Sequence, residues 1–184
     1  MMTANTYVYR YLKTGDIKGS ISWAEIDCDV TVDHARAADF ICAETFDPDP
    51  GEKDISFFRS FRGNDTSRIL DVLSEMLKRR NGNGFSVNSG MMRIDFEEAH
   101  EDLNDIRETV KFIDNDKTKN ECRHYGLVIN STSSLDRLET VTALIELSEF
   151  YALKQKSKKP DRRDILHFAG RGKFDKIAEN TLLL

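Results

Sequence analysis

The sequence predicts an α+β fold: a single compact domain in which an antiparallel or mixed sheet of about four to six strands packs against about three or four helices, with a short C-terminal helical tail. Segments that alternate apolar and polar residues come mostly early, and segments with helical periodicity mostly late. A doubly wound fold would repeat strand and helix regularly instead. The 184 residues are 39% hydrophobic, enough to bury a core without disulfides or metals. We assign residues 1–155 to this domain and 156–184 to a basic linker and amphipathic C-terminal tail.

Patterns with a period of two predict the strands. Tyr7, Tyr9 and Tyr11 stand at alternate positions near the start of the chain, which predicts a strand over 6–12. In the predicted strand 55–61, we expect the phenylalanines to point inward and Arg59 and Arg62 to point outward. Further strands are predicted at 26–32 and 125–130, and in a hairpin that pairs 85–87 with 91–96.

Helical periodicity predicts the helices. The alanine-rich segment 33–46 and the segment 67–80, whose apolar residues share one face, are both predicted to be helical. Ser133 and Asp136 have the spacing of a capping box, and apolar residues follow them at helical intervals. We therefore expect a long central helix that runs from this box to about Lys154.

The segment 97–114 combines a regular apolar stripe with a strong negative charge. Its apolar residues are spaced by 4, 3, 4 and 3, the a/d pattern of a helix that packs along one seam; they are Ala99, Leu103, Ile106, Val110 and Ile113. From Asp95 to Asp116 there are nine acids, opposed only by Arg107 and Lys111. We expect one helix over the segment, with the stripe buried against the domain or against a second copy. A homodimer through the 96–113 apolar stripe is thus possible.

The charge reverses near the C-terminal end, although the net charge of the chain is only −5. From Lys154 to Lys176 basic residues outnumber acids by nine to three. Phosphates attract such a segment, and Phe168 and Phe174 within it offer rings that stack on bases. A solvated linker followed by a tail that docks on the core is the alternative.

The three cysteines, Cys28, Cys42 and Cys122, do not form a close pair, which argues against a secreted disulfide framework. No basic segment followed by an apolar run opens the chain, so we see no signal peptide. No apolar stretch approaches the length of about 18 residues that spans a bilayer. We expect a cytoplasmic protein that does not use a membrane.

Two patterns could hold a metal, and both are incomplete. Glu97 and His100 have the Glu-x-x-His spacing of di-iron bundles, which need a second copy that this sequence lacks. Cys122 and His124, together with another cysteine, lack the spacing of structural zinc. We therefore expect no metal and no cofactor.

Local signals of catalysis are weak. His34 beside Asp33 has no motif of a nucleophilic enzyme around it. Asp114-Asn-Asp116 begins like a calcium loop but lacks the later glycine and glutamate. The glycine pairs lack the spacing and the lysine of a phosphate-binding loop. The chain therefore favours binding over chemistry.

These observations lead us to expect a non-enzymatic regulatory or inhibitory protein that docks on another macromolecule. Its acidic helical face would contact a basic surface, possibly one built for nucleic acid, through Glu97, Glu98, Glu101, Asp102, Asp105 and Glu108. The first alternative is a nucleic-acid-binding protein that uses the basic residues Lys154, Lys156, Lys158, Lys159, Arg162, Arg163, Arg171 and Lys173. The second is a hydrolase or nuclease with a site of dispersed carboxylates and a histidine.

Overall fold

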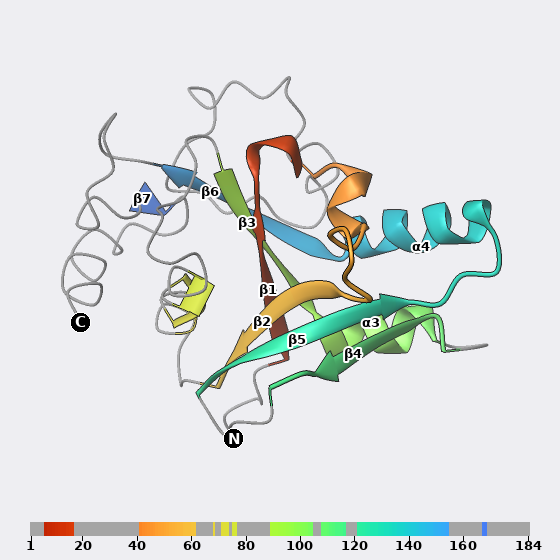
Figure 1. Cartoon of the computed structure of the whole chain (residues 1–184), viewed down its shortest axis with the longest axis horizontal. Coiled ribbons are helices and arrows are strands. Elements are labelled where there is room, and N and C mark those ends of the chain that lie inside the picture. Colours follow the sequence, from red (N-terminus) through yellow and green to blue (C-terminus); the bar gives the residue numbers. More distant parts are fainter. Residues whose placement is uncertain are drawn as a thin grey trace.

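The computed structural model describes residues 6–16, 41–61, 68, 71–73, 75–76, 89–104, 108–116, 121–154 and 167–168. They form an antiparallel sheet with helices packed against it, so the α+β class is confirmed (Figure 1). The strand order is β4-β5-β2-β1-β3-β6-β7. The strands are β1 (Tyr7–Leu12), β2 (Ile55–Ser60), β3 (Ser89–Asp95), β4 (Val110–Asp114), β5 (Cys122–Ile129), β6 (Ser148–Lys154) and β7 (His167–Phe168). The α-helices are α3 (Phe96–Leu103) and α4 (Ser134–Glu146), and the 3-10 helices are η1 (Thr14–Asp16) and η2 (Ala43–Phe46).

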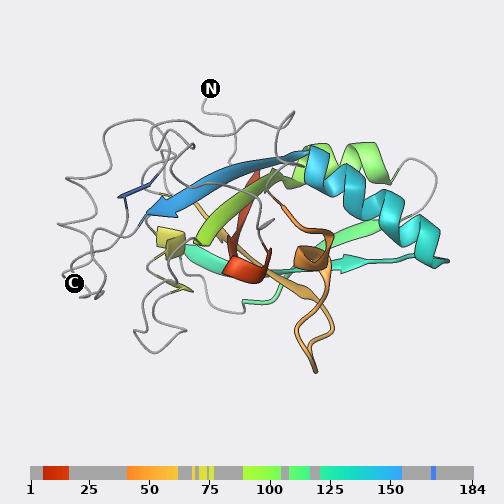
Figure 2. The ribbon, with the colours of Figure 1, turned by 90° about the horizontal axis from the view of Figure 1, so that it is seen from above.

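Two helical connections organise the sheet. α3 links β3 to β4, and α4 links β5 to β6. Since all neighbours in the sheet are antiparallel, the strand order makes β3 parallel to β4 and β5 parallel to β6. Each connection is a β-α-β unit whose strands are separated by others. Both units enclose the central pair β1 and β2, and their helices lie together over one face of the sheet (Figure 2).

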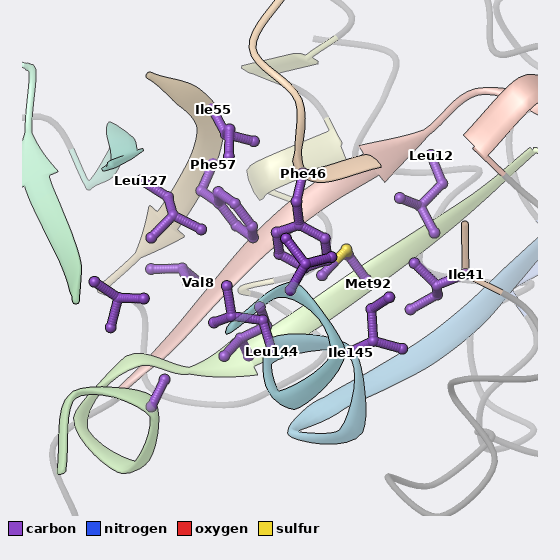
Figure 3. Close-up of a cluster of buried hydrophobic side chains, with 14 of the residues drawn as sticks. Val8, Leu12, Ile41, Phe46, Ile55, Phe57, Met92, Leu127, Leu144 and Ile145 are labelled. Atoms are coloured by element: carbon purple, nitrogen blue, oxygen red, sulfur yellow. The ribbon is translucent and has the colours of Figure 1, made fainter. Parts of the chain in front are cut away.

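That face carries the main hydrophobic core. Strand alternation turns every second residue of the central strands toward the helices, as Val8, Phe57 and Met92 illustrate. Phe46 of η2 and Leu144 of α4 close over them (Figure 3). The remaining buried members of this cluster are Leu12, Ile41, Ile55, Ile94, Ala99, Val110, Tyr125, Leu127, Val141, Ile145 and Phe150.

The opposite face of the sheet is covered near one end. Tyr9, Phe58 and Met91 point to this face and are buried. The Ser60 hydroxyl, on the same face, donates to Asp71 Oδ2 at 2.9 Å. The described residues between 68 and 76 are helical and bury Val72, Leu73 and Met76. The prediction of a helix over 67–80 is confirmed at these positions.

The predicted helix over 97–114 is wrong beyond Leu103. α3 ends there, and Val110–Asp114 is the edge strand β4. Asn104 terminates the helix, because its Oδ1 accepts the N–H groups of Thr109 (2.7 Å) and Val110 (2.9 Å) and its Nδ2 donates to the Val110 carbonyl (2.9 Å). Of the regularly spaced apolar residues, Ala99 and Leu103 therefore belong to a short helix, and Val110 and Ile113 belong to a strand. They do not form one helical stripe.

The predicted helix from Ser133 to Lys154 is wrong in its second half. Its start is confirmed, since the Ser133 hydroxyl accepts the Asp136 N–H at 3.1 Å. α4 ends at Glu146, and β6 follows almost at once. Ser148 and Phe150 are buried, and the residue between them is only half-buried. The pattern of buried residues therefore has a strand period of two in the segment where a helix was predicted.

The remaining predictions have mixed outcomes. The strands over 6–12, 55–61 and 125–130 are confirmed. Of the predicted hairpin, residues 91–95 lie in β3, which pairs with β1 and β6, and 85–87 lies outside the described residues. In the predicted helix 33–46, Ala43–Phe46 is a 3-10 helix. In the predicted helical tail, His167–Phe168 pairs with β6 as a strand. Ile41 and Cys42 are described but are not helical. Residues 33–40, the predicted strand 26–32 and the rest of the tail lie outside the described residues.

Candidate functional site

The acidic face predicted from the sequence lies on α3. Asp95 caps the helix, since its Oδ1 accepts the N–H groups of Glu97 at 3.0 Å and Glu98 at 3.3 Å. A carboxylate at this position also complements the positive end of the helix dipole. Ala99 is the residue of α3 that is fully buried against the sheet. The outer side of the helix is left to charged residues.

Four of the six predicted contact residues project from this helix. Glu97, Glu98, Glu101 and Asp102 are exposed, and no ion pair joins any of them to another described residue. We call these four residues the α3 acidic face. They lie within six consecutive positions, so their charges share one small surface.

The other two predicted contact residues are not on the helix. Glu108 lies after its end, just before β4, and pairs with Lys111 (3.2 Å); the prediction that it extends the helical face is wrong. Asp105 lies outside the described residues. The proposed seam 96–113 is not a continuous helix either: Ala99 and Val110 are buried in the chain's own core, and Ile113 is a 37% exposed strand residue. The homodimer prediction loses the helix on which it rested.

The basic segment is mostly outside the described residues. Lys154 is the last residue of β6. Lys156, Lys158, Lys159, Arg162, Arg163, Arg171 and Lys173 all lie outside the part of the chain that the structure describes.

Arginine and aromatic side chains gather beside the first turn of α3. The Arg59 guanidinium carbon is 4.4 Å from the ring centroid of Phe96, the first residue of α3, and 4.7 Å from that of Phe61. Arg123, which stands opposite Arg59 in the sheet, is 4.8 Å from the same Phe61 ring and pairs with Asp114 (2.9 Å). Phe61 is 44% exposed. We call Arg59, Phe61 and Arg123 the Phe61 cluster.

The Phe61 cluster corrects the expected orientation of β2. Phe57 and Arg59 share the helix-covered face, and Phe58 points to the other face, so phenylalanine and arginine are not sorted into inward and outward sides. Consecutive residues of a strand face opposite sides of the sheet. Phe57 and Phe58 are consecutive, so they cannot both point to the helix-covered face. Arg62 lies outside the described residues.

The residues considered for metal binding do not come together. His100 Nδ1 contacts Asn104 Nδ2, four residues along the chain. Cys42 and Cys122 are half-buried. Within the described part of the chain, no three side chains of histidine, cysteine, aspartate or glutamate form a group that could hold a metal ion. Asp33, His34 and Cys28 are outside that part.

His124 takes part instead in a polar cluster that the sequence did not reveal. Its Nε2 lies 3.0 Å from the Ser56 hydroxyl on the neighbouring strand. Asn115 Nδ2 donates to Asp54 Oδ2 at 2.9 Å. A Cβ added at Gly126 would lie 2.6 Å from Asn115 Nδ2 and 2.3 Å from Asp54 Oδ2. We call Asp54, Ser56, Asn115 and His124 the Gly126 polar cluster. The strand pairing that assembles it has no local signal in the sequence.

A further charged group lies inside the core. Arg10 shares the helix-covered side of β1 with Val8, and its Nη1 donates to the Ser56 carbonyl at 2.8 Å. Burial lowers the pKa of Arg10, while the nearby carboxylates of Asp16 and Asp49 raise it. Arginine stays protonated in proteins, and these two acids offset its charge. We therefore assign Arg10 to the structure of the core and not to a site.

Comparison with family models, with curated proteins and with solved structures finds no match to this chain. Among the described helices, none is both long and apolar enough to cross a bilayer.

Proposed function

We propose that this chain is a regulatory or inhibitory protein that docks on a basic surface of another macromolecule through the α3 acidic face. The observation that carries the proposal is the set of four exposed carboxylates on α3 without an ion pair to any described residue. A basic partner would supply the countercharges that the described residues do not provide at that surface.

The arrangement of the acids has a cost in stability. Glu97 and Glu101 are four residues apart, as are Glu98 and Asp102, so like charges are neighbours on the helix surface. Such pairs destabilise a helix slightly, and lysine at one position of each pair would remove the repulsion. A binding role explains why the acids are kept together, because a one-sign surface raises the rate of encounter with a partner of opposite charge.

The Phe61 cluster supports the same surface. Arg59 contacts both Phe61 and Phe96, so the exposed ring stands next to the start of the α3 acidic face. Aromatic and arginine side chains contribute most of the energy in many protein interfaces. Phe61 is therefore the apolar anchor that we expect beside the acids.

Charge reversal with a matched control tests the proposal. In the α3 variant, Glu98, Glu101 and Asp102 become lysine; in the control variant, Glu52, Glu139 and Glu146, which are exposed elsewhere, become lysine. Each substitution changes the charge by two, so three of them move both variants from −5 to +1.

Tagged wild type and both variants are used for affinity capture from the native host, and captured macromolecules are identified by mass spectrometry and nucleic-acid staining. We expect a basic protein partner that wild type and the control variant retain and the α3 variant loses. Equal retention by all three proteins would contradict the proposal. Capture of nucleic acid that survives in the α3 variant would favour the basic segment instead.

A further inference from the structure

We propose that Ser56 is a nucleophile with His124 as its general base, in a site for uncharged carboxylic esters formed by the Gly126 polar cluster. This inference is independent of the docking proposal, since β2 and β5 supply these two residues and α3 supplies the acidic face. Both side chains are half-buried, so they are held in place and still reachable from solvent.

The contact between the two residues has the geometry of a nucleophile and its base. Ser56 Oγ and His124 Nε2 are 3.0 Å apart, within the range for proton transfer from a hydroxyl to an imidazole. When Nδ1 carries the proton, Nε2 accepts from the hydroxyl. The Phe58 ring packs against the imidazole, with centroids 5.4 Å apart and planes at 50°, which restricts the orientation of the base.

A second pair of polar groups borders this contact. Ser56 stands directly opposite Gly126 in the sheet, so both face the same side. The linked side chains of Asp54 and Asn115 lie over Gly126 on that side. Only glycine leaves them this room, since a Cβ would be 2.3 Å from the Asp54 carboxylate. Asn115 gives one of its two amide hydrogens to Asp54 and keeps the other for an oxygen of a bound molecule.

The proposed reaction is acyl transfer followed by hydrolysis. Ser56 Oγ forms a bond to the ester carbonyl carbon while its proton passes to His124 Nε2, and the electron pair of the carbonyl π bond moves to the carbonyl oxygen. The carbon–oxygen bond to the alcohol then breaks, and the imidazolium returns the proton to the departing alkoxide. Water, deprotonated by the same imidazole, then bonds to the acyl carbon. The bond from that carbon to Ser56 Oγ breaks, the acid leaves, and the imidazolium returns its proton to Ser56 Oγ. The Asp54 carboxylate repels anions, so an uncharged ester fits this site better than a phosphate ester.

An uncharged fluorophosphonate tests the nucleophile directly. Attack forms an Oγ–P bond and expels fluoride, while the proton passes to His124. We expect one adduct per chain, located on Ser56 by peptide mass spectrometry. Turnover of p-nitrophenyl butyrate is measured in parallel.

Three variants complete the test: Ser56→Ala, His124→Gln and, as a control, Ser131→Ala at an exposed loop serine. Circular dichroism establishes that each is folded. We expect Ser56→Ala to abolish labelling and His124→Gln to slow it by about 100-fold, while Ser131→Ala labels like wild type. If Ser56→Ala does not fold, the His124→Gln rate and the location of the adduct decide the question. Absence of an adduct on Ser56 in the wild type, or labelling that His124→Gln leaves unchanged, would overturn the inference.

Discussion

α3 and α4 cross the same face of the sheet, but they divide their surfaces between core and solvent very differently. α4 buries Thr140, Val141, Leu144 and Ile145, a full stripe of four residues. In α3, Ala99 is the one buried residue, and the exposed side of the helix carries mostly acidic residues. α4 is therefore a structural helix, and its removal would expose the hydrophobic core to solvent. α3 packs on the core through Ala99 and the partly buried Phe96 and Leu103, and its outer surface carries the four exposed acids.

The largest difference between the two helices should come from the core side of α4. Leu144→Ala removes a fully buried side chain, and we expect it to lower the free energy of unfolding by about 2–5 kcal/mol. Leu138→Ala on the same helix is the control, since Leu138 is 55% exposed and its loss should change stability by about 0.5 kcal/mol or less. Urea denaturation measures both. Equal effects would contradict the assignment of α4 as the core helix.

The next largest effect should come from the end of α3. Asn104→Ala removes the acceptor for the N–H groups of Thr109 and Val110 and the donor to the Val110 carbonyl. We expect a loss of about 1–3 kcal/mol, because these backbone groups lose their partners. Asn104→Asp keeps the acceptor but places a carboxylate oxygen against the Val110 carbonyl, which the amide nitrogen contacted at 2.9 Å, so it should also lower stability. If both variants unfold like wild type, another feature terminates the helix.

The smallest effect should come from the outer side of α3, and it should be favourable. Glu101→Lys turns the repulsive pair with Glu97 into an attractive one, in the better orientation with the acid first, and places a cation near the negative end of the helix. We expect a gain of about 0.5 kcal/mol in the free energy of unfolding, together with weaker binding of the partner. A loss of stability would contradict this, because it would mean that Glu101 makes a stabilising contact and is not simply a solvated acid beside Glu97.

The sequence predicted the class of the fold and the elements whose signals are local. β1 follows from three alternating tyrosines, and the start of α4 follows from the Ser133–Asp136 box. The acidic face was also predictable, because Glu97, Glu98, Glu101 and Asp102 lie within six positions of the chain and are exposed on a helix that has a cap.

The rest could not be predicted, because it depends on contacts between distant segments. The spacing from Ala99 to Ile113 fits one helix as well as it fits a short helix and a strand. The hydrogen bonds of the Asn104 side chain to Thr109 and Val110 decide for the second arrangement. The Gly126 polar cluster needs β2 beside β5, and nothing near Ser56 in the sequence indicates His124 as its neighbour. The Phe61 cluster likewise depends on that pairing, which places Arg123 opposite Arg59.

The most direct test of the docking account is the salt dependence of association. The partner captured by wild type is purified, and its association rate with wild type, the α3 variant and the control variant is measured by stopped flow at about 0.01 to 0.5 M salt, across which screening increases strongly. We expect the wild-type rate to fall by about tenfold or more over this range. We also expect the control variant to keep a steep salt dependence, and the α3 variant to bind slowly at every salt concentration with little dependence. Equal rates and equal salt dependence for the α3 variant and wild type would contradict the docking proposal.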